Sequence, residues 1–166
     1  MSQINQELYN EILTNMPIIC VDGVLKNDKG EILFLKRDNE PEKGKWWFPG
    51  GRLLKNERLE DAILRKVKEE TNIDVRVKKY LGFTETIFET GPFGIPVHTV
   101  NFTYELSLLS NDIVIDNLHS NFIWTKKINE LDLNFEILNL LKSTIIDDKL
   151  TFGVDFEFND FYGPIK

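Results

Sequence analysis

The 166-residue chain contains one cysteine, two histidines and no apolar run long enough to cross a bilayer. The single cysteine, Cys20, excludes an internal disulfide. The N-terminus lacks the basic segment followed by an apolar one that a secretion signal has. The sequence shows no internal repeat, low-complexity stretch or linker rich in proline and serine. These absences predict one soluble, cytoplasmic domain that spans residues 1–166.

Positive charge is also scarce, with 20 basic against 27 acidic residues and a net charge of −7. Such a chain repels a phosphate backbone unless a basic patch or a bound cation intervenes. We therefore expect no nucleic-acid partner, and the lack of a long apolar run predicts no membrane partner. The hydrophobic content of 42% is sufficient for one proper core.

The pattern of apolar residues predicts an α/β fold. Helical spacing in residues 1–16 and the proline that follows predict an N-terminal helix, with Ile4, Leu8, Ile12 and Leu13 on one face. A hairpin signal between two apolar runs predicts strands at about 17–25 and 31–37. The remaining predicted elements are strands at 74–89, 97–109 and 121–127 and helices at 57–71 and 135–146. This order predicts a mixed, partly antiparallel sheet with helices against it. The aromatic tail, 149–166, is expected to pack on the domain or on a partner.

The predicted helix 57–71 carries polar residues on its apolar side. Glu70 lies near the centre of the apolar stripe and Lys66 lies inside it; the stripe consists of Leu59, Ala62, Ile63, Val67 and Ile73. One interpretation is an ion pair between Lys66 and Glu70 at the margin of the core. The other is that Glu69 and Glu70, together with backbone oxygens of the preceding turn, bind a hard cation such as Mg²⁺.

The stretch from residue 51 to residue 73 resembles the Nudix box, G-x5-E-x7-R-E-U-x-E-E-x-G-U, in which U is a bulky apolar residue. The matching positions are Gly51, Glu57, Arg65, Val67, Glu69, Glu70 and Ile73. Two positions depart: Lys66 replaces the first glutamate of the helical trio and Asn72 replaces a glycine. Asparagine tolerates the left-handed conformation expected at the end of a helix, so only the lysine is a severe change.

The resemblance implies a Nudix-type α/β/α sandwich with a mixed sheet. It implies a hydrolase of nucleoside diphosphates linked to another group, with Mg²⁺ or Mn²⁺ held by Glu69, Glu70 and the carbonyl of Gly50. It further implies that Glu57 and Arg65 form a structural pair that braces the loop on the helix.

The segments flanking the box resemble the GDP-mannose mannosyl hydrolase branch, from about residue 17 to residue 140. That branch also lacks the first glutamate of the trio. It hydrolyses GDP-mannose or GDP-glucose to GDP and free sugar by attack of water at the sugar C1, and its members form homodimers. Loss of the carboxylate at Lys66 fits a reaction that leaves the diphosphate whole.

By this resemblance Arg37 and Arg52 bind the diphosphate and stabilise its charge as it departs. His119 matches the histidine that takes the proton of the attacking water. Leu118 stands where the branch has a glutamine metal ligand, so Glu69 would have to complete the coordination. His98 is a secondary candidate for substrate contact, with a core position as the alternative. An aromatic run, Trp46, Trp47 and Phe48, either stacks on a base or sugar or belongs to the core.

Two other functions remain open. One is a pyrophosphohydrolase that cleaves a P–O bond of ADP-ribose, a dinucleotide or a nucleoside triphosphate. The other is a regulatory domain that binds a nucleotide-sugar without turning it over.

Overall fold

Strand β1 (Ile18–Lys26) runs through the middle of a mixed seven-stranded sheet in the computed structural model, which describes residues 4–144. It pairs in parallel with β6 and antiparallel with β2 and β4, so the predicted mixed sheet is confirmed. The path of the sheet is β3-β2-β1-β6-β5, with β4 added to β1 and β7 added to β2. The other strands are β2 (Ile32–Arg37), β3 (Trp46–Trp47), β4 (Gly50–Arg52), β5 (Val75–Phe88), β6 (Val97–Leu108) and β7 (His119–Thr125).

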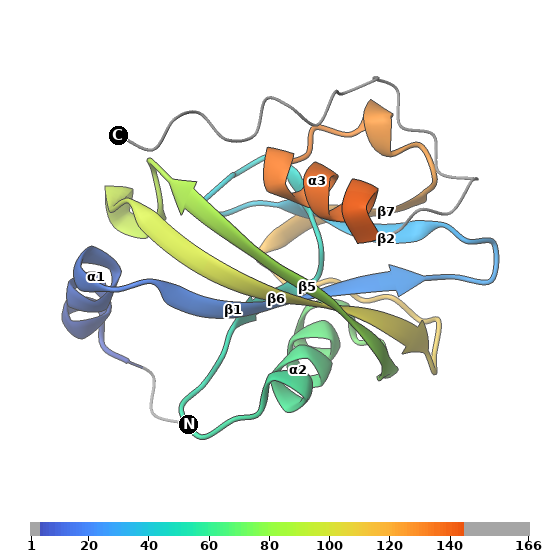
Figure 1. Cartoon of the computed structure of the whole chain (residues 1–166), viewed down its shortest axis with the longest axis horizontal. Helices are drawn as coiled ribbons and strands as arrows, with labels where there is room; N and C mark the ends of the chain where they lie inside the picture. The colour runs from blue at the N-terminus through green and yellow to red at the C-terminus, as the bar shows by residue number, and fades with distance from the viewer. Residues whose placement is uncertain (1–3, 145–166) are drawn as a thin grey trace.

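Helices cover the sheet on both sides. Helix α2 (Leu59–Thr71) lies against one face and α3 (Phe135–Thr144) against the other, while α1 (Gln6–Asn15) stands beside the start of β1 (Figure 1). Two short 3-10 turns, Pro92–Gly94 and Ile128–Glu130, lie in the connections. This arrangement is the predicted α/β/α sandwich. In the described part of the chain, no helix has the length and apolar character needed to span a membrane.

Side chains that alternate between the two faces of the central strands form two separate hydrophobic cores. Val24 of β1 and Phe34 of β2 point toward α3, whereas Val21 and Leu33 point toward α2. Because side chains alternate across a strand and both faces are covered, both sets of positions are apolar. The large buried side chains on the α3 side include Phe48 and Ile128, and those on the α2 side include Ile63 and Leu106.

The start of α2 corrects one predicted boundary. The helix begins at Leu59, with Arg58 as its extended N-cap, so Glu57 precedes it. The carboxylate of Glu57 instead accepts the Leu54 backbone N–H at 3.0 Å, which holds the loop before the helix. At the other end Asn72 is left-handed, with φ of 59°, and its N–H donates to the Lys68 carbonyl. The tolerance expected of asparagine at this position is confirmed.

The predicted N-terminal helix is confirmed as α1, but it begins at Gln6 after the N-cap Asn5, so Ile4 precedes it. The helix is only partly covered. Leu13 is buried in the α3-side core and Tyr9 packs against it, but Ile4 and Leu8 are about half exposed. The predicted strand at 121–127 is shifted, because β7 begins at His119, which was expected to lie in a loop. The prediction for the tail, 149–166, falls outside the described residues.

Candidate active site

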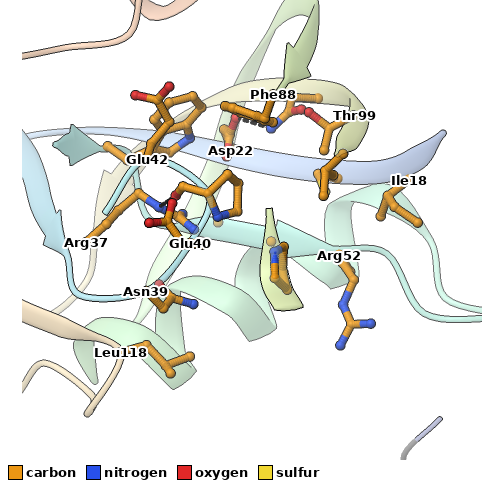
Figure 2. A pocket seen from close by; sticks show the side chains of 18 of the residues that line it. Ile18, Asp22, Arg37, Asn39, Glu40, Glu42, Arg52, Phe88, Thr99 and Leu118 are labelled. Carbon is orange, nitrogen blue, oxygen red and sulfur yellow. Dashed lines mark hydrogen bonds between the residues drawn. The ribbon is translucent and has the colours of Figure 1, made fainter. Parts of the chain in front are cut away.

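A cavity of about 470 Å³ opens where the sheet, the loop after β2, and helices α1 and α2 meet. The acidic and basic side chains of β1, β2, the loop after β2, β4, α2 and β7 that line it are Asp22, Arg37, Glu40, Glu42, Arg52, Lys66, Glu70 and His119. Arg37 and Arg52 lie on opposite sides of the view, with Asp22 between them (Figure 2). A cavity lined by charges of both signs is suited to an ionic ligand.

The Gly-Gly turn is shaped by what lies against it. The Gly50 N–H donates to Glu70 Oε2 at 2.9 Å, which ties the turn to α2. A Cβ on Gly50 would collide with the Val21 carbonyl oxygen and the Asp22 carboxylate. A Cβ on Gly51, whose φ is +148°, would lie 2.7 Å from Lys66 Cε. Gly50 is therefore required by close approach, and Gly51 by its backbone conformation.

Lys66 joins the two glutamates of α2. Its Nζ lies 2.9 Å from Glu70 Oε1 and 3.3 Å from Glu69 Oε2. The predicted Lys66–Glu70 ion pair is thus confirmed. Burial alone would lower the pKa of Lys66, but the charges and hydrogen bonds of Glu70 and Glu69 outweigh it and raise that pKa. Lys66 is therefore a cation in this site.

A second ion pair fixes the loop before α2. Arg65 Nε and a terminal guanidinium nitrogen lie 2.6 and 2.8 Å from the two oxygens of Glu57. The same guanidinium donates to the Arg52 carbonyl at 3.2 Å and contacts Glu69 at 3.1 Å. The expected structural pairing of Glu57 with Arg65 is confirmed, and through the Arg52 carbonyl it also holds β4.

The two arginines expected at the diphosphate both line the cavity. Arg37 Nε donates to the Pro41 carbonyl at 2.6 Å, and its guanidinium lies 5.9 Å from the ring centroid of Trp47. Arg52 is exposed, and its guanidinium lies 4.4 Å from the ring centroid of Tyr9 in α1. Arg37 is therefore held by the loop after β2, and Arg52 by stacking on the N-terminal helix.

His119 also lines the cavity, next to Leu118. Its Nδ1 lies 2.7 Å from Asp116 Oδ1, and the ring is buried. A carboxylate can accept a hydrogen bond from Nδ1–H, and in that tautomer Nε2 is the ring nitrogen left to accept another. Backbone bonds from Val114 to the Thr71 carbonyl and from Asp116 to the Glu70 carbonyl dock this loop on the end of α2. The docking fixes the loop that leads into His119.

His98 lies elsewhere. It occupies the opposite face of β6 from the cavity-lining Thr99, and its Nε2 is 2.8 Å from Glu85 Oε1. The lining of the cavity does not include it, nor does it include Glu69. Trp47 and Phe48 are buried and Phe48 stacks on Phe34, but both also border the cavity. Both are core residues, and part of each side chain also lines the cavity.

Sequence reasoning missed a buried polar pair on the cavity floor. Asn101 Nδ2 donates to Asp22 Oδ2 at 2.7 Å, and both residues are buried. Burial raises the pKa of Asp22 to about 7, against the opposing hydrogen bond from Asn101. Among the described side chains, Asn101 Oδ1 and Thr99 Oγ1 are buried oxygens without a partner. The signal was present in the sequence: polar residues at alternate, inward positions of otherwise apolar strands.

The donor set allows a limited form of metal binding. Within residues 4–144, no group of three or more histidine, cysteine or acidic side chains is placed to hold an ion. Glu70 and Glu69 are adjacent carboxylates, and Glu70 is already engaged by Gly50 and Lys66. Mg²⁺ is commonly bound by one or two carboxylates plus substrate phosphates and waters. The residues therefore fit one ion shared with a phosphorylated ligand, and not a cage built by the protein alone.

Comparison with known proteins identifies the family. The family model described as NUDIX domain matches residues 16–127. The chain belongs to the Nudix family. It is 34% identical over 121 residues to the low-salt glycan biosynthesis protein Agl8 of Haloferax volcanii, covering 72% of this chain and 77% of that protein. It is 33% identical over 97 residues to an ADP-ribose pyrophosphatase of Methanocaldococcus jannaschii, covering 58% of this chain and 54% of that protein.

Solved structures share the Nudix fold. A MutT protein from Methanosarcina mazei superposes with a TM-score of 0.69 at 23% identity, over 79% of this chain and 95% of that one. The NUDIX domain of NrtR from Shewanella oneidensis, solved with ADP ribose, gives a TM-score of 0.62 at 23% identity, over 89% and 100% of the two chains. The predicted Nudix membership is confirmed, whereas these similarities do not distinguish the GDP-mannose branch from others.

Proposed function

We propose that this Nudix protein is a Mg²⁺-dependent hydrolase of a nucleotide-sugar, GDP-mannose or GDP-glucose by preference, that releases GDP and the free sugar. The observation that carries the proposal is the His119–Asp116 pair in the cavity wall, 2.7 Å apart. It supplies a base away from α2, while α2 itself has a lysine, Lys66, where the Nudix box has a glutamate.

In the proposed reaction, the oxygen of a water molecule attacks C1 of the sugar and its proton passes to His119 Nε2. The bond between C1 and the diphosphate oxygen breaks, and its electron pair leaves with GDP. Asp116 keeps the imidazole in the correct tautomer and stabilises the imidazolium that forms. Every atom of the diphosphate stays in the leaving group.

Arg37 and Arg52 bind the diphosphate from the two sides of the cavity. A guanidinium presents paired donors to phosphate oxygens and keeps its charge at every working pH. Negative charge grows on the diphosphate as it departs, so these contacts strengthen in the transition state. Glu69, Glu70 and the Gly50 carbonyl are the groups that would hold Mg²⁺, which when bound neutralises part of that charge.

The sugar end fits the cavity floor. Asp22 and Asn101 form a buried pair, and Asn101 Oδ1 and Thr99 Oγ1 have no partner among the described residues. Buried acceptors without partners are costly unless a ligand satisfies them. Sugar hydroxyls are donors of this kind. The similarity to a relative named for glycan biosynthesis agrees with a sugar-bearing substrate.

A second function, pyrophosphohydrolysis of ADP-ribose, is favoured by two similarities. One relative is an ADP-ribose pyrophosphatase and one structural neighbour was solved with ADP ribose. In that reaction water attacks phosphorus, and the products are two phosphorylated fragments. A third function, binding of a nucleotide-sugar without turnover, would follow if loss of the glutamate at position 66 removed catalysis.

One experiment separates the three functions. The protein is incubated with GDP-mannose, GDP-glucose and ADP-ribose in ¹⁸O-water with Mg²⁺, and the products are analysed by mass spectrometry. We expect label in the free sugar and none in GDP. Label in a phosphate would contradict attack at C1 and support the pyrophosphohydrolase, while binding without any product would support the regulatory domain.

A further inference from the structure

The ammonium of Lys66 occupies the space between the two carboxylates of α2. Its nitrogen is 2.9 Å from Glu70 Oε1 and 3.3 Å from Glu69 Oε2. The stem of the side chain passes beside Gly51, where a Cβ would lie 2.7 Å from Lys66 Cε. The Lys66 side chain is only 15% exposed. The lysine is therefore a fixed part of the site.

A cation fixed at this point competes with a divalent ion. Glu69 and Glu70 are the only acidic side chains that contact Lys66 among the described residues, and both are assigned to Mg²⁺. An ion that bridged them would lie close to the ammonium and be repelled by it. Glu69 is further engaged by Arg65 at 3.1 Å. The protein alone should therefore hold a divalent ion weakly.

The same ammonium faces the ligand space. Lys66 lines the cavity together with Arg37 and Arg52, so three cationic side chains border it. Four acidic residues also border it. Glu70 is paired with Lys66 itself at 2.9 Å and Glu42 with Lys45 at 2.6 Å. Glu40 is exposed, and burial raises the pKa of Asp22 to about 7. A diphosphate that enters the cavity meets a lysine where other Nudix boxes present a third carboxylate.

We infer that Lys66 is a built-in cation for the diphosphate: it binds phosphate oxygens directly and replaces part of the positive charge that a metal ion would bring. Two consequences distinguish this role from a merely structural ion pair. The diphosphate binds without any divalent ion, and divalent ions bind tightly only together with it. The inference rests on the proposed placement of the diphosphate in the cavity, but not on the identity of the base or the sugar.

The test uses inorganic pyrophosphate and Mn²⁺ as separate probes of the whole chain. Calorimetry in EDTA measures binding of pyrophosphate, and electron paramagnetic resonance measures binding of Mn²⁺ alone. We expect the wild-type protein to bind pyrophosphate in EDTA, and Lys66→Gln to bind it at least about tenfold more weakly, the loss of one charge-assisted hydrogen bond. Lys66→Arg keeps the charge and should retain most of the binding. Thermal unfolding of each variant checks that it is folded.

Replacing Lys66 should affect Mn²⁺ binding in the opposite direction from pyrophosphate binding. Lys66→Glu restores the acidic residue of the box, so it should bind Mn²⁺ alone at least about tenfold more tightly than wild type. Its pyrophosphate binding should then require a divalent ion. Wild-type protein that binds Mn²⁺ as tightly as Lys66→Glu, or a folded Lys66→Gln that binds pyrophosphate normally in EDTA, would overturn the inference. Neither result would bear on C1 attack, which the ¹⁸O label tests independently.

Discussion

Arg65 donates hydrogen bonds to both carboxylate oxygens of Glu57, eight residues away, at 2.6 and 2.8 Å. The pair joins the loop before α2 to the middle of that helix, and Arg65 extends it to the carbonyl of Arg52. Both side chains are mostly covered, with 20% of Arg65 and 14% of Glu57 exposed. The position of the loop before α2 thus depends on a contact that takes no part in the proposed chemistry.

The first prediction concerns the stability that this pair provides. The hydrogen bond from Arg65 lowers the pKa of Glu57 below its ordinary value of 4.5. A carboxyl with a lowered pKa in the folded state stabilises the protein above its unfolded pKa, and this contribution is lost as the pH falls through the folded value. Glu57→Gln should therefore lower the free energy of unfolding by about 1 kcal/mol at pH 7 and by less below pH about 4.

Urea unfolding of both proteins at a series of pH values measures this difference. Glu89→Gln is a matched control, because Glu89 is exposed on a loop and its change should stay within about 0.5 kcal/mol. A difference for Glu57→Gln that stayed constant from pH 7 to pH 3 would show that its charge is not the source of the effect.

Much of this site was predictable because the Nudix box is a local pattern on one helix. The stripe of α2 and the Lys66–Glu70 pair follow from residue spacings on the helix, and the Glu57–Arg65 brace is what the resemblance to the Nudix box implies. Asp22 and Asn101 are 79 residues apart, and only the parallel pairing of β1 with β6 makes them neighbours. No local pattern encodes such a register.

The short strands were missed for a related reason. Trp46–Trp47 and Gly50–Arg52 are too brief to show any periodicity, and they exist because β2 and β1 offer free edges to pair with. His119 was placed in a loop, but pairing with Arg37 across the sheet extends β7 to include it. Tertiary pairing, and not local propensity, decides these segments.

The second prediction concerns the metal. Glu70 is 5% exposed and its two oxygens meet Gly50 and Lys66, so Glu70→Gln removes a charge with little change of volume. The Mg²⁺ concentration that gives half-maximal turnover should rise by at least about tenfold. Glu69→Gln, at a half-exposed position outside the cavity lining, should raise it less. Wild-type turnover by Glu70→Gln at limiting Mg²⁺ would remove Glu70 from the metal site.

The third prediction concerns the diphosphate. Arg52→Ala removes a cation whose contact tightens as charge develops, so it should cost about 2–4 kcal/mol of transition-state stabilisation. That corresponds to a fall of about a hundredfold or more in kcat/KM. Lys55→Ala removes an exposed charge three residues away that does not border the cavity and should leave kcat/KM nearly unchanged. An active Arg52→Ala enzyme would mean that the diphosphate binds elsewhere.

The fourth prediction is that the protein forms a homodimer through α1. Leu8 of α1 and Ile4 just before it are 47% and 49% exposed, although Leu13 of the helix is buried, which leaves an apolar edge open. Light scattering at micromolar concentration should give twice the chain mass of 19.4 kDa. Leu8→Ser should shift the mass toward that of a monomer, whereas Val114→Ser, on the loop docked at the end of α2, should not. A wild-type mass of one chain would rule the dimer out.

The last prediction identifies the base. His119 Nδ1 is bound by Asp116 at 2.7 Å, so only Nε2 is free to accept a proton from water in the cavity. His119→Gln should lower kcat by at least about a hundredfold, the usual contribution of a positioned general base. Asp116 acts through the ring as a positioning residue, and Asp116→Asn should lower kcat by a smaller factor without a matching rise in KM.

His98→Gln is the matched control for His119→Gln, because His98 pairs with Glu85 and does not border the cavity. Its kcat should stay close to that of wild type, and a large loss would return His98 to the substrate contacts expected from the sequence. The ¹⁸O label then tests the site of attack independently of which residue is the base. Residual product from His119→Gln that carries its label in the sugar keeps attack at C1. A His119→Gln enzyme with full activity and label still in the sugar would show that another group, with the buried Asp22 as the first to test, takes the proton.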